Sequence, residues 1–247
     1  MAEVLPFPEG GYRFIKGVFP YSAGVAAEPR FAIERVRLDS PVPLEEGFRR
    51  IKTHLLGIGR PLAAFCACEL RSPAPFTEAG FADFNRGYVS VLEKWGLIRD
   101  GLNPVARSNV CPEFDPPAVP VFYAFSYTVP GDRGGFVVAG NGEAPEGMPN
   151  YRDHIVRRGD VSQEGLREKA AWVLGEQERR LRALGAGWAD VGASQLYTVH
   201  PVFPWIGEEL GSRGAARGGV TWHYARPPVV AIDFEMDCRG VPVERIL

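Results

Sequence analysis

The chain of 247 residues contains 45% hydrophobic and 23% charged residues, as in an ordinary globular protein, and its length suits one large domain or two small ones. Its net charge of −2 argues against a nucleic-acid-binding scaffold, and no apolar run reaches the roughly 18–20 residues that span a bilayer. The first residues, MAEVLPFPEGG, lack the charged and apolar regions of a signal peptide. We therefore expect a cytoplasmic protein that binds neither nucleic acid nor membrane.

The four cysteines give no sign of a metal site. Cys66 and Cys68 alternate within AAFCACELR, where a strand would turn both thiols to one face. A metal site would need two more ligands, and no C-x-x-C or His-x-His motif stands nearby. We expect small, buried hydrophobic side chains here, and neither a metal nor a cofactor.

Hydrophobic periodicity divides the first half of the chain into strands and helices. RFAIERVRL alternates apolar and charged residues, as a half-buried strand does, whereas Leu44, Phe48, Ile51 and Leu55 recur at helical spacing. The prolines and acidic residues that follow Ser40 predict that this helix starts there. The expected elements are a strand at 30–38, a helix at 40–59, a strand at 61–70, a helix at 75–96, and strands at 104–110 and 120–130.

The order of elements restarts after the turn-forming sequence GDRGG at 131–135. The expected elements are then a strand and turn at 136–145, a long helix at 162–185, a strand at 188–199, a short helix at 204–214 and two strands within 219–240. Both halves thus read β, α, β, α, β, β.

The two halves also match residue by residue over one segment. Residues 59–70 align without a gap on residues 185–196, with Gly59 on Gly185, and a Pro-Pro pair precedes the last strand of each half. We therefore predict an internal duplication, with one repeat at residues 1–131 and the other at residues 132–247.

Five short motifs carry a family resemblance. They are PYSAGV (20–25), FADFNRGY (81–88), PVARSNV (104–110), FVVAGNGE (136–143) and YARPPVVAIDFEMD (224–237). In this order they resemble the motifs of the RidA/YjgF superfamily of small enamine and imine deaminases, over nearly the whole chain as two copies. The last motif puts Glu235 at the family's glutamate position.

The resemblance implies an α+β protein built from two tandem RidA-like repeats with the chorismate-mutase-like fold. Each repeat would be a mixed β-sheet covered on one face by two helices. Family members are usually trimers with ligand pockets between subunits. In these pockets an arginine binds the substrate carboxylate, while a backbone amide, a tyrosine and a glutamate-bound water act at the imine carbon. The matching residues are Arg107, Tyr21 and Glu235. In GNGEAPEG, Gly140 would allow close backbone approach to a ligand, with an amide pointed at an oxygen.

This sequence departs from the family pattern in one important way. The arginine occurs only in the first half, because Gly218 and Gly219 stand at the matching place in the second. The glutamate occurs only in the second half, since its counterpart in the first falls near Ser126. Neither repeat therefore carries a full site, and we expect a composite site that joins Arg107 of one repeat to Glu235 of another.

Arg107 can be argued from its chemistry alone. A guanidinium remains charged at any working pH, so within an apolar strand it needs an anion. Its rigid fork of donors matches a carboxylate. The anion is either a ligand or an internal partner such as Glu113 or Asp115.

The acidic residues of the last strand leave two readings open. Asp233, Glu235 and Asp237 alternate with apolar residues and would share one face of a strand. On a solvent face they would be plain surface charges, whereas in a pocket one of them would have a raised pKa suited to acid–base catalysis. Tyr21 and Asn85 are equally open, as a site tyrosine or a packed ring, and as a site residue or a surface amide.

These features predict a cofactor-free hydrolase of C–N bonds that releases ammonia from a small carboxylated enamine or imine, such as a 2-aminomuconate-like or 2-aminoacrylate-like acid. Glu235 and Tyr21 are the candidate catalytic residues; Arg107, Asn109, Gly140 and Asn85 are the candidate substrate-binding residues. The expected partners are this small acid and further copies of the chain, with a trimer favoured. Two alternatives stay open: a chorismatase-like enzyme on the same tandem fold, and a non-catalytic protein that binds a small acid.

Overall fold

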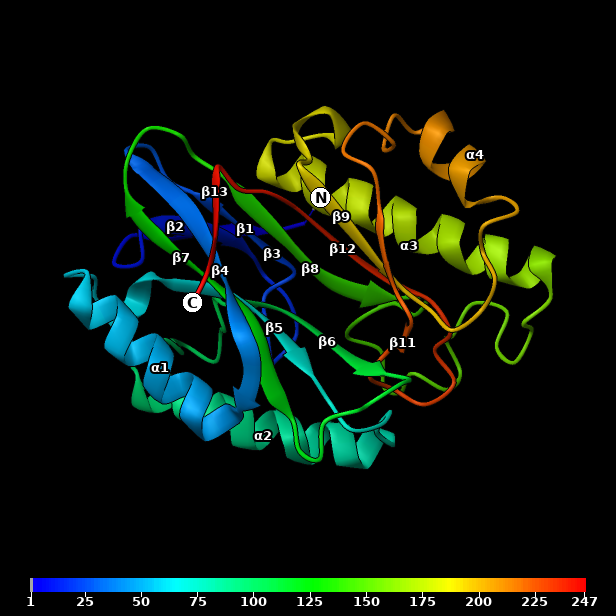
Figure 1. Ribbon diagram of the computed structural model, residues 1–247, viewed down its shortest axis with the longest axis horizontal. Coiled ribbons are helices and arrows are strands. Elements are labelled where there is room, and N and C mark those ends of the chain that lie inside the picture. The colour runs from blue at the N-terminus through cyan, green and yellow to red at the C-terminus, as the bar shows by residue number, and fades with distance from the viewer. Residues whose placement is uncertain (1) are drawn as a thin grey trace.

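The computed structural model describes residues 2–247, which form two mixed β-sheets and four α-helices (Figure 1). The seven-stranded sheet has the order β1 (Val4–Phe7), β2 (Tyr12–Ile15), β3 (Gly24–Ala27), β8 (Phe136–Gly142), β12 (Glu235–Gly240), β9 (Ala193–Tyr197) and β10 (Thr221–His223). The six-stranded sheet has the order β11 (Ala225–Arg226), β6 (Ala106–Pro112), β5 (Phe65–Arg71), β7 (Val121–Pro130), β4 (Phe31–Pro43) and β13 (Val243–Ile246). The helices are α1 (Leu44–Gly57), α2 (Glu78–Lys94), α3 (Gln163–Leu184) and α4 (Ile206–Ser212).

The same unit of four strands and two helices occurs in both sheets. In the order β4-α1-β5-α2-β6-β7, β5 and β6 are parallel, and β7 is antiparallel to both β4 and β5. In the order β8-α3-β9-α4-β10-β12, β9 and β10 are parallel, and β12 is antiparallel to both β8 and β9. The 3-10 turns at Leu62–Ala64 and Trp188–Asp190 are offset by 126 positions (188 − 62), the offset of the ungapped sequence match. The expected α+β fold of two tandem units is confirmed.

The two sheets exchange terminal strands. The N-terminal strands β1–β3 join the seven-stranded sheet, where Gly24 of β3 lies opposite Val138 of β8. The C-terminal strand β13 joins the six-stranded sheet, where Val243 lies opposite Glu34 of β4. Tyr21 lies before β3, and its neighbour Ser22 bridges to Ala106 of β6, so this segment lies where the two sheets meet. The repeat boundary between residues 131 and 132 stays a prediction.

The helix ends follow local capping chemistry. The Ser162 hydroxyl accepts from the Gly165 N–H to start α3, and Gly185 ends it in the left-handed conformation at φ 80°. The expected start of α1 at Ser40 is wrong. Ser40 continues β4, and α1 begins after Pro43, because the φ angle of that proline suits a helix start and its ring has no N–H to satisfy.

Other boundaries also differ from the expectation. The predicted strand at 188–199 begins with a 3-10 turn, so only Ala193–Tyr197 form β9. Residues 219–240 form three short strands rather than two, because the chain leaves β9 after His223 and pairs with β6 of the other sheet at Ala225 and Arg226. Pro227 and Pro228 then end β11. Proline removes a ladder donor and therefore breaks strand pairing.

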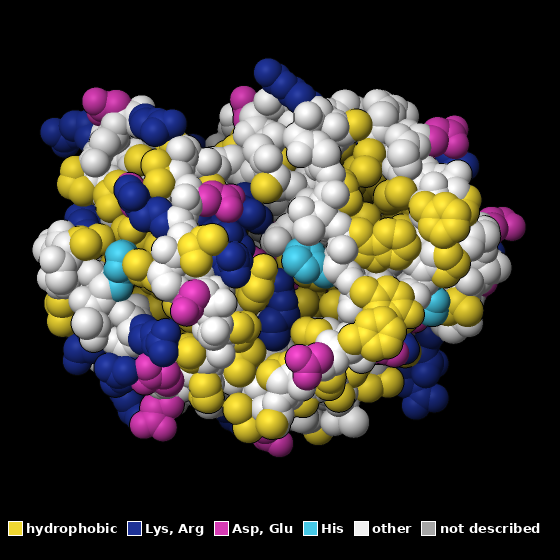
Figure 2. Space-filling model, viewed as in Figure 1, with side chains coloured by type: hydrophobic (Ala, Val, Ile, Leu, Met, Phe, Trp, Pro, Cys, Tyr) yellow, Lys and Arg dark blue, Asp and Glu magenta, His cyan; other side chains and the backbone are white. Residues whose placement is uncertain are grey.

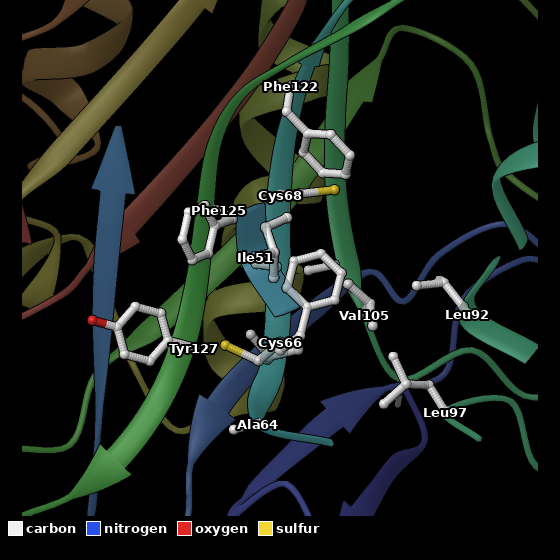
Figure 3. Close-up of a cluster of buried hydrophobic side chains, with 14 of the residues drawn as sticks. Ile51, Ala64, Cys66, Cys68, Leu92, Leu97, Val105, Phe122, Phe125 and Tyr127 are labelled. Atoms are coloured by element: carbon white, nitrogen blue, oxygen red, sulfur yellow. The ribbon is translucent and has the colours of Figure 1, made fainter. Parts of the chain in front are cut away.

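Each sheet buries an apolar face beneath its helices. Cys66 and Cys68 of β5 lie in the cluster under α1 and α2 together with Ile51 and Leu92 (Figure 3), as expected of small hydrophobic side chains. Leu166, Ala170, Val173 and Leu174 of α3 pack against Met236 and Cys238 of β12. In Figure 1 the two sheets lie between α1 and α2 on one side and α3 and α4 on the other. None of the helices within residues 2–247 is long and apolar enough to cross a membrane.

Polar side chains join the two sheets. Arg35 Nε donates to Glu69 Oε1 at 2.6 Å, and Gln195 Nε2 of the other sheet donates to both Glu69 (3.3 Å) and Asp237 (2.8 Å). All four residues are buried, so each charge requires a partner there. Figure 2 shows Lys and Arg side chains set into the middle of one face of the molecule. Buried polar and charged side chains are thus concentrated between the two sheets.

Candidate active site

A cavity lies where β6, β8 and the start of β12 meet. It encloses about 460 Å³, part of it open to solvent. Five of the six residues predicted from the sequence line it, from four separate segments of the chain: Tyr21, Arg107, Asn109, Gly140 and Glu235. Asn85 does not line it. One chain thus brings the arginine of the first repeat and the glutamate of the second repeat into the same cavity.

Arg107 is buried without an acidic partner. The residue is 3% exposed, its Nη2 donates to Asn85 Oδ1 at 2.7 Å, and its Nη1 has no hydrogen-bond partner. No carboxylate oxygen within residues 2–247 lies within 4 Å of its guanidinium nitrogens, and the expected partner Glu113 binds Arg226 instead at 2.7 Å. The internal ion pair is therefore excluded for the described chain, and the guanidinium retains a donor for a ligand.

Glu235 faces the same cavity from the first position of β12. It is 4% exposed, and a Cβ at Gly140 would collide with its Oε1, so a larger residue at position 140 would displace the carboxyl. Burial raises the pKa of Glu235 well above its usual range, with the nearby Asp237 and Glu143 carboxylates adding to the effect, while Arg107 and Arg71 oppose it. The carboxyl is therefore held in its protonated form over a wider pH range than a free glutamate.

The other two acids of the predicted cluster have different surroundings. Asp237 alternates with Glu235 on β12, but its oxygens accept from Gln195 (2.8 Å) and from the Tyr197 hydroxyl (2.9 Å). Asp233 does not share this face, because it precedes β12 and binds Lys169 of α3 at 2.7 Å. Of the three acids, only Glu235 lines the cavity.

The remaining predicted residues differ in what they offer a ligand. The Asn109 side chain accepts from Ser72 through Oδ1 at 2.9 Å, and its buried Nδ2 is unpartnered. The Gly140 N–H donates to the Ser108 hydroxyl at 3.1 Å, so this amide already has a partner. Burial, with Glu146 and Tyr151 nearby, raises the pKa of Tyr21 and keeps its hydroxyl protonated. Asn85 is buried rather than on the surface, and it holds Arg107.

Sequence reasoning missed one wall of the cavity. Tyr151 and Glu146 come from the segment between β8 and α3, residues 143–162, and Glu146 is bound by Arg180 at 3.2 Å. Phe81 of α2 and Ile232 complete the apolar part. The length of the segment was the available signal, because connections of this length in a compact domain are usually functional.

The amino-acid sequence matches the model of one protein family, described as 2-aminomuconate deaminase CnbZ, over residues 4–245. The chain belongs to the 2-aminomuconate deaminase family. This deaminase is 52% identical to the 2-amino-5-chloromuconate deaminase of Comamonas testosteroni, in an alignment that covers all of both chains. The deaminase is accordingly an enzyme that cleaves a carbon–nitrogen bond, and the deaminase family predicted from the motifs is confirmed.

Solved structures share less with the deaminase. A chorismatase is 12% identical with a TM-score of 0.49, over 89% of this chain and 77% of that one. The YjgF gene product of E. coli is 14% identical with a TM-score of 0.34, over 44% of this chain and 80% of that one.

Proposed function

We propose that this deaminase hydrolyses the carbon–nitrogen bond of a 2-aminomuconate-type acid, a six-carbon dicarboxylate that carries an enamine, and releases ammonia. The relative from Comamonas testosteroni is named for a chlorinated acid of this kind. The observation that carries the proposal is that Arg107 and Glu235 line the same cavity. Arg107 supplies a buried cation with a free Nη1, and Glu235 supplies a protonated carboxyl.

Arg107 binds the carboxylate next to the amino-bearing carbon. The free Nη1 and the free Asn109 Nδ2 are both buried donors in the wall of the same cavity, and buried donors gain most from an ionised acceptor. Asn85 positions the guanidinium from behind through Nη2. The substrate's carboxylate thus supplies the anion that the protein does not.

Glu235 carries the protons of the reaction. Its carboxyl protonates the enamine carbon next to the amino-bearing carbon, which converts the C–NH₂ group to an electrophilic iminium and leaves a carboxylate. That carboxylate takes a proton from the water that attacks the amino-bearing carbon, giving a carbinolamine. Glu235 then protonates the nitrogen, ammonia leaves, and the hydroxyl proton returns to Glu235 as the ketone forms. One water is consumed and one ammonia is released, with no cofactor.

Two further residues surround the reacting carbon. The Tyr21 hydroxyl remains a donor because its pKa is raised, and it can hydrogen-bond the carbinolamine oxygen. Gly140 admits the Glu235 carboxyl because it has no side chain.

The family match favours this activity over the two alternatives. A chorismatase would release pyruvate from chorismate, and a binding protein would release nothing. Ammonia release from 2-aminomuconate, measured beside pyruvate release from chorismate, separates the three activities. We expect ammonia only; pyruvate alone, or neither product, would contradict the proposal.

We further propose that the enzyme works in the cytoplasm as a homotrimer, the assembly that the RidA resemblance implies. Light scattering of the purified chain tests the assembly, and a monomeric mass would contradict it.

A further inference from the structure

A buried ion pair lies behind the strand ends that carry Gly140 and Glu235. Glu143 follows β8 and Lys169 belongs to α3, and neither side chain is exposed to solvent. Lys169 Nζ lies 3.2 Å from Glu143 Oε1 and 2.7 Å from Asp233 Oδ2. Glu143, Lys169 and Asp233 do not line the cavity, so the proposed chemistry makes no use of them.

Glu143 holds the backbone that leads into Glu235. Its Oε1 accepts from the Asp233 N–H at 2.6 Å, and its Oε2 accepts from the Phe234 N–H at 2.9 Å. These are the two amides immediately before Glu235. The next residues along both strands are already paired, since Glu235 lies opposite Gly142 in the ladder. The carboxylate therefore extends the β8–β12 pairing past its end.

The same short segment is held from a second side. The Thr198 hydroxyl donates to the Asp233 carbonyl at 2.7 Å, and the Lys169 ammonium binds both Glu143 and Asp233. The backbone before Glu235 is thus fixed at two N–H groups and one C=O group. Such support holds the backbone from which the Glu235 side chain extends, and it therefore restricts where the carboxyl can lie.

Stability alone does not account for this arrangement. Burying two charges is costly, and a well-packed apolar pair of the same volume is often as stable or more so. An apolar pair, however, has no oxygen that could accept hydrogen bonds from the two backbone N–H groups before β12. The reaction rate depends on these hydrogen bonds, since a displacement of a catalytic group by about 1 Å can cost roughly 100-fold in rate.

We propose that Glu143, held by Lys169, is a positioning residue that sets the Glu235 carboxyl against the reacting carbon. The inference rests on the proposed role of Glu235. It predicts that loss of the Glu143 carboxylate affects the chemical step rather than substrate binding, because Arg107 and Asn109 lie on another strand, β6.

The test compares Glu143→Gln with Glu178→Gln. Glu178 lies on the same helix as Lys169, pairs with Arg213 at 3.0 Å and accepts from Trp188 Nε1 at 3.1 Å. None of its hydrogen bonds within residues 2–247 reaches β12, so its variant controls for loss of a partly buried ion pair. For Glu143→Gln we expect kcat to fall about tenfold or more, while KM and the Kd for cis,cis-muconate, an unreactive diacid, change less than about twofold. Glu178→Gln should retain the wild-type kcat.

A second variant keeps the test decisive if Glu143→Gln does not fold. Glu143→Gln combined with Lys169→Met removes both charges of the pair, and it should show the same fall in kcat with normal muconate binding. Wild-type kcat in a folded Glu143 variant, or an equal fall in Glu178→Gln, would overturn the inference. Full activity of Glu235→Gln would instead overturn the proposed function, and the inference with it.

Discussion

At the scale of single residues, the surroundings of Arg107 explain how a lone guanidinium can be buried. Its Cζ lies 4.8 Å from the Tyr88 ring centroid and 5.0 Å from that of Tyr21, and aromatic faces attract a cation. These contacts reduce the cost of burial but do not use the Nη1 donor. The site is therefore electrostatically prepared for an anion before the substrate arrives.

Arg107→Lys should reduce kcat/KM on 2-aminomuconate by about 100-fold, because a lysine is a point charge that cannot bind Asn85 and a carboxylate together in a fixed fork. Steady-state ammonia release measures the effect. Arg226→Lys is the matched control, since Arg226 pairs with Glu113 outside the cavity. Equal kcat/KM values for wild type and Arg107→Lys would refute the carboxylate-binding role.

Glu235→Gln should lower kcat about 100-fold or more, as expected for loss of a general acid–base residue. The wild-type kcat should fall as pH rises through the raised pKa of Glu235, and the kcat of the variant should lose this dependence.

The raised pKa of Glu235 also affects stability. Above the usual glutamate pKa, the native protein binds more protons at Glu235 than the unfolded chain does, so the free energy of unfolding falls as pH rises. Thermal melts at pH 5 and pH 8 should show a smaller drop in Tm for Glu235→Gln than for wild type; an equal drop would count against the buried, protonated carboxyl.

At the scale of elements, α3 connects the repeat architecture to the site, because it carries Lys169 and Arg180 against the strands β8 and β12. Its start depends on one side chain, the Ser162 hydroxyl. Ser162→Ala should lower the free energy of unfolding by about 1 kcal/mol. Ser212→Ala, at an exposed hydroxyl in α4, should leave it nearly unchanged in urea unfolding. Equal values for the two variants would show that the cap does not stabilise α3.

Periodicity and capping predicted the elements well where local chemistry decides them. The 162–185 prediction lies within a residue of both ends of α3, since Ser162 and Gly185 specify these ends by themselves. The start of α1 was missed because β4 pairs with β7 as far as Pro43, and this pairing lies far away in the sequence. The wall formed by residues 143–162 could not be assigned, since such a segment has no periodicity to read.

At the scale of the whole molecule, the exchange of terminal strands fixes the two repeats to each other. Glu244 of β13 accepts from Arg239 Nε at 2.6 Å and lies 3.1 Å from Arg35 Nη1, so it joins both sheets. Although burial opposes it, the hydrogen bond and charge of Arg239, with Arg35, lower the pKa of Glu244. The stabilisation is therefore present above the usual glutamate pKa and lost as pH falls.

Glu244→Gln should destabilise the protein by about 1 kcal/mol at pH 7, because solvent screens the half-exposed Glu244 carboxylate in its pairs with Arg35 and Arg239. The difference from wild type in urea unfolding should shrink as pH falls from the usual glutamate pKa through the lowered pKa of Glu244, because the wild-type carboxylate is protonated over that range. Glu3→Gln, which breaks an exposed pair with Lys16, should have almost no effect. A similar cost for both variants would argue against β13 as a connection between the sheets.

The composite site was predictable in its residues but not in its assembly. The motifs identified Arg107 and Glu235, and their split between repeats indicated a shared pocket. The sequence contained no sign that the pocket closes within one chain, because this depends on β6 meeting β8, where the Gly140 N–H donates to the Ser108 hydroxyl at 3.1 Å. Asn85 was predicted to contact substrate, whereas its visible partner is Arg107.

The central claim is that Arg107 and Glu235 act on one substrate in one cavity. A crystal structure with bound cis,cis-muconate tests it most directly. We predict one carboxylate about 2.7–2.9 Å from Arg107 Nη1, with the carbon chain passing the Glu235 carboxyl. Muconate bound elsewhere, such as at the exposed aromatic groove of Trp222 and Tyr224, with the cavity empty, would contradict the account.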